Sequence, residues 1–184
     1  MKNIPLFLIF ILFFNKFIVA QENKSVYQNL YFGIEQDIIP FFCKGFSTGI
    51  WLGFNQFRAN FNYNQNVIPG FLSVEAIKEE KVSRIQFGLD FFLNKKHKGI
   101  FLNLSLSQVN MQIETKDLFK GKIFDNYFGL GMGYNYYFFK NFYLSPRLLI
   151  HFKLIQTNNI LLGSLNYNSN LILPEINLNL GYKF

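Results

Sequence analysis

Few side chains in this 184-residue chain could carry out chemistry, since it has two histidines and one cysteine. His151 is the histidine that lies in a segment of alternating apolar and polar residues, so it is the candidate general base. Its neighbours on the same face are Leu149 and Lys153, while Thr157 and Ser164 follow in a connecting segment. A nucleophile must lie within hydrogen-bond reach of its base. This spacing does not predict a catalytic pair, and a reaction centred on His151 is kept only as an alternative.

A larger group of charged and titratable residues shares one face of the alternating segments. If that face is enclosed, its charges must pair, because an unpaired buried ion is costly. We therefore predict a structural network that plugs the interior. The alternative is a gated conduit, in which pairs such as Arg58 and Asp90 on neighbouring strands exchange partners. The predicted network comprises Glu35, Arg58, Arg84, Asp90, Arg147, His151 and Glu175.

Eight alternating segments position these side chains. The clearest is the end of the chain, where every even position from 176 to 184 is apolar and every odd one is polar or glycine. A period of two is typical of β-strands. We predict strands at 28–37, 46–54, 57–66, 83–94, 99–112, 125–138, 142–154 and 173–184.

The connections between these segments alternate strictly between short and long. The short ones are 55–56, 95–98 and 139–141, and the long ones are 38–45, 67–82, 113–124 and 155–172. This pattern predicts an antiparallel meander with tight turns at one end and loops at the other. The apolar run 160–162 suggests that the strands flanking the last loop continue into it, and His97 is expected to be solvated in its turn. By position, Glu35, Arg84, His151 and Glu175 should lie toward the loop end, and Arg58, Asp90 and Arg147 toward the turn end.

The two faces of the strands differ in a way that sets their orientation. One face is uniformly apolar, which in water would form a very large exposed patch. The other carries all three arginines and eight of the thirteen glycines, where a water-exposed surface would carry Lys and Glu. Small residues suit the narrow interior of an eight-stranded barrel, and arginine suits buried pairing. We predict an all-β fold, an eight-stranded antiparallel up-and-down transmembrane β-barrel with the apolar face toward lipid.

Aromatic residues cluster where the strands meet the short turns, as expected for a belt at one membrane interface. The predicted belt comprises Phe54, Phe57, Phe91, Phe92, Phe138, Phe142, Tyr143, Tyr182 and Phe184.

Composition excludes several classes of protein. The chain is 50% hydrophobic and 16% charged, which excludes a disordered chain. A single cysteine excludes a disulfide framework, and two histidines at unrelated positions predict no metal site. After residue 20 no apolar run is long enough for a membrane-spanning helix. We expect no cofactor and no nucleic-acid partner.

The first twenty residues are predicted to be a secretory signal peptide. Lys2 precedes an apolar run at 4–14, and a short stretch ends at Ala20. That run is shorter than the roughly 20 residues that a spanning helix needs, and a basic start with a small residue at the end is typical of a cleaved signal. The predicted domains are therefore a signal peptide at 1–20 and a barrel at 21–184.

The signal, the alternating strands and the terminal residues Tyr182, Lys183 and Phe184 resemble those of small bacterial outer-membrane β-barrel proteins of the eight-stranded kind. The resemblance implies a location in the outer membrane of a Gram-negative bacterium. It also implies that Tyr182 and Phe184 form the assembly signal read by the barrel-assembly machinery, with membrane lipids and lipopolysaccharide as surroundings. Some small outer-membrane barrels are lipid A acyl-chain enzymes with a serine and a histidine on the outer-end face, a pattern that His151 does not match.

Together these features favour a monomeric, non-enzymatic envelope or surface-binding protein with a plugged polar lumen. The alternatives are a narrow pore for ions or small solutes and a lipid-modifying enzyme centred on His151. Lysines in the outer loops could contact anionic head groups.

Overall fold

Eight antiparallel strands form a closed, hydrogen-bonded barrel, which confirms the predicted fold class. The computed structural model describes residues 30–68, 76–154, 160–163 and 165–184, so the predicted signal peptide at 1–20 lies outside the described residues. The barrel strands are β1 (Leu30–Asp37), β2 (Phe46–Phe54), β3 (Phe57–Val67), β4 (Ile77–Phe92), β5 (Gly99–Thr115), β6 (Lys120–Tyr137), β7 (Phe142–Lys153) and β10 (Ile172–Lys183).

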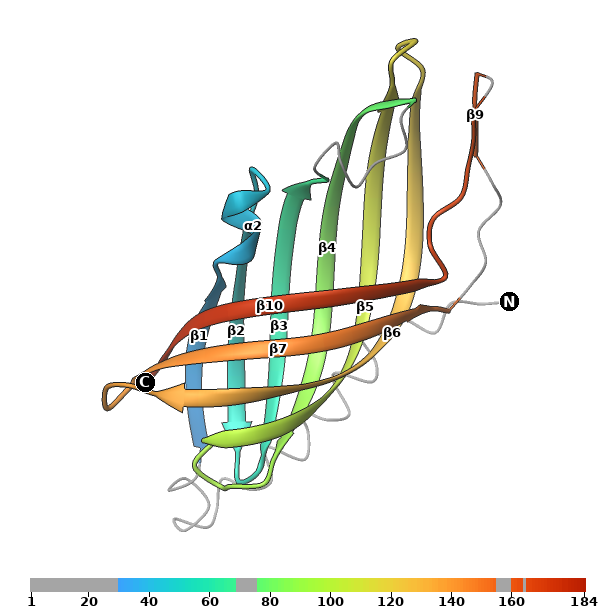
Figure 1. Cartoon of the computed structure of the whole chain (residues 1–184). Helices are drawn as coiled ribbons and strands as arrows, with labels where there is room; N and C mark the ends of the chain where they lie inside the picture. Colours follow the sequence, from blue (N-terminus) through green and yellow to red (C-terminus); the bar gives the residue numbers. More distant parts are fainter. Residues whose placement is uncertain (1–29, 69–75, 155–159, 164) are drawn as a thin grey trace. The chain divides into compact units, whose positions relative to one another are not determined.

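The strands follow one another around the ring in chain order, and β1 closes it against β10 (Figure 1). The chain divides into two units, Met1–Leu30 and Tyr31–Phe184, and all of the barrel except Leu30, the first residue of β1, belongs to the second. The shortest connection, between β2 and β3, is a two-residue turn in which Asn55 has a φ of 53°. Asparagine tolerates this left-handed conformation better than most residues do, so the local sequence suits a tight turn.

The apolar face of the strands lies on the outside of the barrel. Leu102, Leu104 and Leu106 of β5 are exposed, and the residues between them, Asn103 and Ser105, are buried inside. Within this band, the outward residues of the other barrel strands are likewise mostly apolar and exposed. Because a lipid environment offers no hydrogen bonds, a closed ring with this exposed apolar band is suited to a bilayer.

The strands β4, β5 and β6 extend well beyond this band, and β5 and β6 rise furthest (Figure 1). The predicted loops at 67–82 and 113–124 were therefore too long, since β4 begins at Ile77 and β5 and β6 pair as far as Glu114 and Lys120. Pairing continues there because the inward face becomes apolar, with Val109, Met111 and Ile113 buried.

A small hairpin covers this apolar inner face. β8 (Ile160–Leu162) pairs with β9 (Leu165–Tyr167) in a separate two-stranded sheet. Leu162 is buried in a cluster with inward residues of β4, β5 and β6, and Ile160 and Tyr167 pack against it. The expectation that residues 160–162 prolong the flanking strands was wrong, because this apolar run instead covers the inner face of the extension.

The first loop contains α2 (Ile39–Phe42), a four-residue helix with Pro40 buried. None of the helices in the described residues is long and apolar enough to cross a membrane.

A charge introduced on the outward face should lower the free energy of unfolding, and the loss should be larger the deeper the charge lies in the bilayer. Leu104→Arg places a cation in the middle of the band on β5 and should lower the free energy of unfolding by about 2–4 kcal/mol. Gln108→Arg, on the same face of the same strand but beyond the fully apolar rows, is the control, with an expected cost of about 0–1 kcal/mol. Denaturant unfolding in phospholipid bilayers measures both. Equal costs for the two variants would contradict the assignment of this face to lipid.

Candidate functional site

Four charged side chains meet in the lower half of the barrel, near the short turns. We call Glu35, Arg58, Asp90 and Arg147 the charge cluster. Arg58 contacts Glu35 at 2.8 Å through Nη1 and Asp90 at 2.6 Å through Nη2. Arg147 binds Glu35 through Nη2, and its Nη1 lies 3.9 Å from Asp90 Oδ2. Two cations and two anions therefore alternate, and the cluster carries no net charge.

Neutral side chains also form hydrogen bonds with this cluster. The Tyr143 hydroxyl donates to Glu35 Oε1 at 2.7 Å and accepts from Trp51 Nε1 at 2.7 Å. The Asn103 amide donates to Asp90 Oδ1. These partners come from β7, β2 and β5, while the four charges come from β1, β3, β4 and β7. The network therefore crosses the lumen rather than following one strand.

Aromatic rings enclose the cluster. The Arg58 guanidinium carbon lies 4.9 Å from the ring centre of Phe92, 5.2 Å from that of Phe101 and 5.4 Å from that of Trp51. Arg58, Asp90, Phe92 and Phe101 are all fully buried, at 0% exposure. Cation–π contacts of this kind gain strength when the cation is desolvated.

Glycines provide the space that these rings occupy. A Cβ on Gly33 would lie 2.5 Å from the Trp51 ring, and one on Gly181 would lie 2.5 Å from the Tyr143 hydroxyl. Eight strands enclose little more than their own side chains. Large rings fit opposite residues that have no side chain, which explains why glycine lies at positions such as 33 and 181.

His97 is buried beside the aromatic rings that enclose the cluster. Its ring centre lies 5.1 Å from that of Phe92, 5.6 Å from that of Tyr31 and 6.0 Å from that of Trp51. The expectation that His97 is solvated was wrong, because the residue is 0% exposed. The turn between β4 and β5 directs this ring inward, while its lysines stay in solvent. Burial, followed by the positive charges of Arg58 and Lys183, lowers the pKa of His97 to about 4, and Asp90 acts in the opposite direction.

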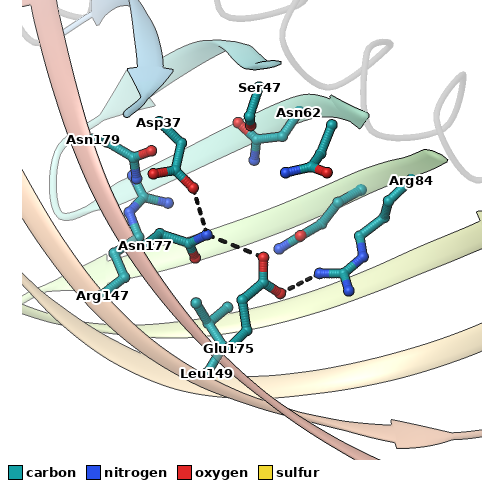
Figure 2. A pocket seen from close by; sticks show the side chains of 11 residues that line it. Asp37, Ser47, Asn62, Arg84, Arg147, Leu149, Glu175, Asn177 and Asn179 are labelled. Atoms are coloured by element: carbon teal, nitrogen blue, oxygen red, sulfur yellow. Dashed lines mark hydrogen bonds and ion pairs between the residues drawn. The ribbon is translucent and has the colours of Figure 1, made fainter. Parts of the chain in front are cut away.

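A second group of predicted residues lies in the polar middle of the lumen. The Glu175 carboxylate binds Arg84 and lies 2.6 Å from Nε2 of His151. Asn177 links Glu175, at 3.0 Å, to Asp37, at 2.8 Å. Figure 2 shows Arg84, Glu175, Asn177 and Asp37 around a cavity of about 30 Å³, which Asn62 and Ser47 also line. A cavity of this size holds about one water molecule.

The structure thus divides the seven predicted residues between two groups. Arg58 and Asp90 lie directly opposite each other in the register of β3 and β4. Glu35 belongs with the charge cluster, so its predicted place near Arg84, His151 and Glu175 was wrong. Strands in a barrel are staggered as well as tilted, so positions within two different strands cannot be compared to give their relative heights in the lumen.

Tyr182 and Phe184 lie on the outward side, at the seam between β1 and β10. Phe184 stacks on Phe32 with ring centres 4.7 Å apart and meets Tyr182 edge-on at 4.9 Å. Tyr143 and Phe92 do not belong to this outer aromatic group, because both are fully buried in the lumen. Strand phase would have revealed this, since each directly follows an outward phenylalanine.

Sequence reasoning missed a buried ion pair near the hairpin. Lys153 Nζ lies 3.0 Å from Asp125 Oδ1 and 2.6 Å from the Ser169 hydroxyl, which also binds Asp125. Lys153 shares a strand face with His151, but Ser169 lies in the predicted loop at 155–172. No strand periodicity could identify it.

The structure also brings a serine toward His151. Ser105, Gly129 and His151 lie in one row across β5, β6 and β7. A Cβ on Gly129 would meet the Ser105 hydroxyl and lie 2.6 Å from His151 Nδ1, and neither of these two atoms has a hydrogen-bond partner. The two residues are 4% and 1% exposed, so a substrate could not reach them while the lumen is closed. Among the described residues, no group of His, Cys, Asp and Glu is placed to hold a metal ion.

Comparison with solved structures finds similar barrels. The N-terminal β-barrel domain of Pseudomonas aeruginosa OprF is similar at a TM-score of 0.49 and 15% identity, over 84% of this chain and 97% of that one. Neisserial surface protein A (NspA) is similar at 0.47 and 18%, over 85% and 97%. Ail, the attachment invasion locus protein of Yersinia pestis, is similar at 0.47 and 15%, over 84% and 96%. At this identity the likeness is one of strand arrangement.

The comparisons of sequence find no match. No family model matches the chain, and no curated protein matches it.

Removing one charged member of the charge cluster should lower the free energy of unfolding of the barrel. Glu35→Gln leaves two buried arginines with a single carboxylate, and we expect a loss of about 3–5 kcal/mol in the free energy of unfolding. The double variant Glu35→Gln with Arg147→Gln restores neutrality and should recover part of this loss, since neighbouring substitutions couple. Denaturant unfolding of the purified barrel measures both. A loss below about 1 kcal/mol for the single variant would contradict a dry, paired cluster.

Buried His97 should make stability depend on pH. Unfolded, it titrates near 6.5, whereas in the barrel it stays neutral down to about 4. Between these values the unfolded state binds more protons, so the free energy of unfolding falls as the pH is lowered from 7 to 4. The variant His97→Phe should show a smaller fall over the same range. Identical slopes for the two proteins would show that His97 is not held neutral.

Proposed function

We propose that the protein is an integral outer-membrane barrel with a closed lumen, and that it acts without catalysis as a structural or binding protein of the bacterial envelope. The observation that supports this most directly is the charge cluster. It is formally neutral, ion-paired across the lumen and packed between aromatic rings, and Arg58 and Asp90 in it are fully buried. A solute would have to break ion pairs and displace the rings of Phe92, Phe101 and Trp51 to pass.

The outward face supports the membrane location. Its exposed apolar side chains would aggregate in water, and lipid is the environment in which they are stable. A signal peptide at 1–20 would deliver the chain across the inner membrane. Tyr182 and Phe184, which lie together at the seam of the barrel, would serve as the signal for assembly.

The absence of catalysis is inferred from burial. His151 binds Glu175, and Ser105 lies beside it, so the elements of a nucleophilic site are near each other. Both Ser105 and His151 are nearly inaccessible. Envelope binding would therefore fall to the part of the barrel beyond the lipid band, where β4, β5 and β6 extend.

Planar-bilayer recording of the purified protein tests the closed lumen. We expect no steady conductance from the wild type, because the charge cluster and its rings fill the cross-section. Arg84→Ala, which leaves the cluster intact, is the control and should also be silent. A steady wild-type conductance that Arg58→Ala alters would overturn the proposal in favour of a narrow pore.

A further inference from the structure

The outward face of the extension formed by β4, β5 and β6 changes from apolar to basic over successive rows of residues. Adjacent residues on the three strands form rows across the sheet, and Phe87, Leu106 and Phe128 make the highest row in which all three members are apolar. The third row beyond it consists of Lys81, Gln112 and Lys122, which we call the basic row.

The height of the basic row distinguishes it from an ordinary head-group contact. Lys81 lies six residues beyond Phe87 along β4, which corresponds to about 20 Å along the strand and about 15 Å along the membrane normal for a typical strand tilt. Phospholipid head groups occupy only about 5–8 Å beyond the hydrocarbon. The basic row is therefore at a height that the sugars of a glycolipid reach.

The shape of this surface suits a polar head group. A groove of about 430 Å³ lies over the basic row, with Glu79, Glu114 and Lys120 from the next row also lining it. Lys81 and Lys122 flank Gln112 on either side, about 10 Å apart for two strand spacings. All three are exposed. The ammonium groups of Lys81 and Lys122 can pair with a phosphate, and the amide of Gln112 between them can form hydrogen bonds with a hydroxyl.

The charge balance leaves this surface positive. Lys78 and Lys120 both pair with Glu114, at 2.6 and 3.6 Å, and Lys81 pairs with Glu79 at 2.9 Å. Within the described part of the chain, Lys122 has no ion-pair partner. Four lysines thus face two glutamates, which favours an anionic partner.

We propose that the basic row binds the phosphorylated sugar head group of a glycolipid in the surrounding outer leaflet. The acyl chains of this lipid lie against the apolar rows below, including Phe87 and Leu106, and its phosphates contact Lys81 and Lys122. Exposed Phe124, one row below Lys122, meets the junction between chains and sugar. The inference rests on the proposed function, since it requires the barrel to lie in a membrane that contains such lipids.

Binding of purified bacterial lipopolysaccharide to the full-length mature barrel in detergent micelles tests the basic row. The variant Lys81→Gln with Lys122→Gln should bind about tenfold more weakly than the wild type, because lysines near an anionic surface each contribute to affinity. The matched control is Lys95→Gln with Lys96→Gln, two exposed lysines in the turn at the opposite end of the barrel, and it should bind as the wild type does. A heat-modifiable gel shift confirms that each variant is folded.

Two further probes identify the source of the phosphate. Dephosphorylated lipopolysaccharide should bind the wild type as weakly as the intact lipid binds the double variant. Phosphatidylglycerol should compete poorly, because its head group is too short to reach the basic row. Unchanged binding by the double variant, or equal competition by phosphatidylglycerol, would overturn the proposal. Either result could occur with a silent, membrane-embedded barrel, so it would leave the closed-lumen function intact.

Discussion

The narrow cross-section of an eight-stranded ring is the constraint on which the rest of this structure depends. Such a ring leaves room for side chains and little else, so every charge that points inward must find its partner inside. Arg58 forms ion pairs with two carboxylates and cation–π contacts with three aromatic rings. The glycines opposite the large rings follow from the same limit on space. The neutral charge cluster and the glycine-rich lining are two results of one geometric requirement.

The lumen is organised in three layers along the barrel. The lowest holds the charge cluster, its aromatic rings and His97. The middle layer is polar, with Arg84, Glu175 and Asn177 around a small cavity. The highest is apolar and is covered by the β8–β9 hairpin. A single strand, β5, shows the change, since its inward residues run from Phe101 through asparagine and serines to Val109 and Ile113. The polar middle of the lumen therefore lies between a layer rich in aromatic rings and a layer rich in aliphatic side chains.

Much of this could be predicted from the sequence, because strand phase is a local property. A period of two located all eight barrel strands and assigned the arginines to the interior. The predictions that were wrong or missing are those that depend on how the strands are staggered. Glu35 joined the lower cluster because β1 pairs with β10 in a register that no single strand encodes. The proximity of Ser105 and His151 was missed for the same reason, since it depends on the register that places Gly129 of β6 between them.

Other features depend on contacts between distant segments. Ser169 binds Asp125 and Lys153 from a loop with no periodicity, and the lengths of β4, β5 and β6 depend on a hairpin that follows them in the chain. The inward position of His97 depends on the conformation of a turn whose sequence, rich in lysine, is typical of a solvated one.

The hairpin has a practical consequence for anyone who wishes to display a foreign peptide on this barrel. Long surface connections normally tolerate insertions, and the segment between β7 and β10 is the longest of them. Leu162, however, completes the packing of Val109, Met111 and Ile123. An epitope tag placed between Ile160 and Tyr167 would uncover those side chains, so the tip between β5 and β6, where Lys116 and Asp117 are exposed, is the better graft point.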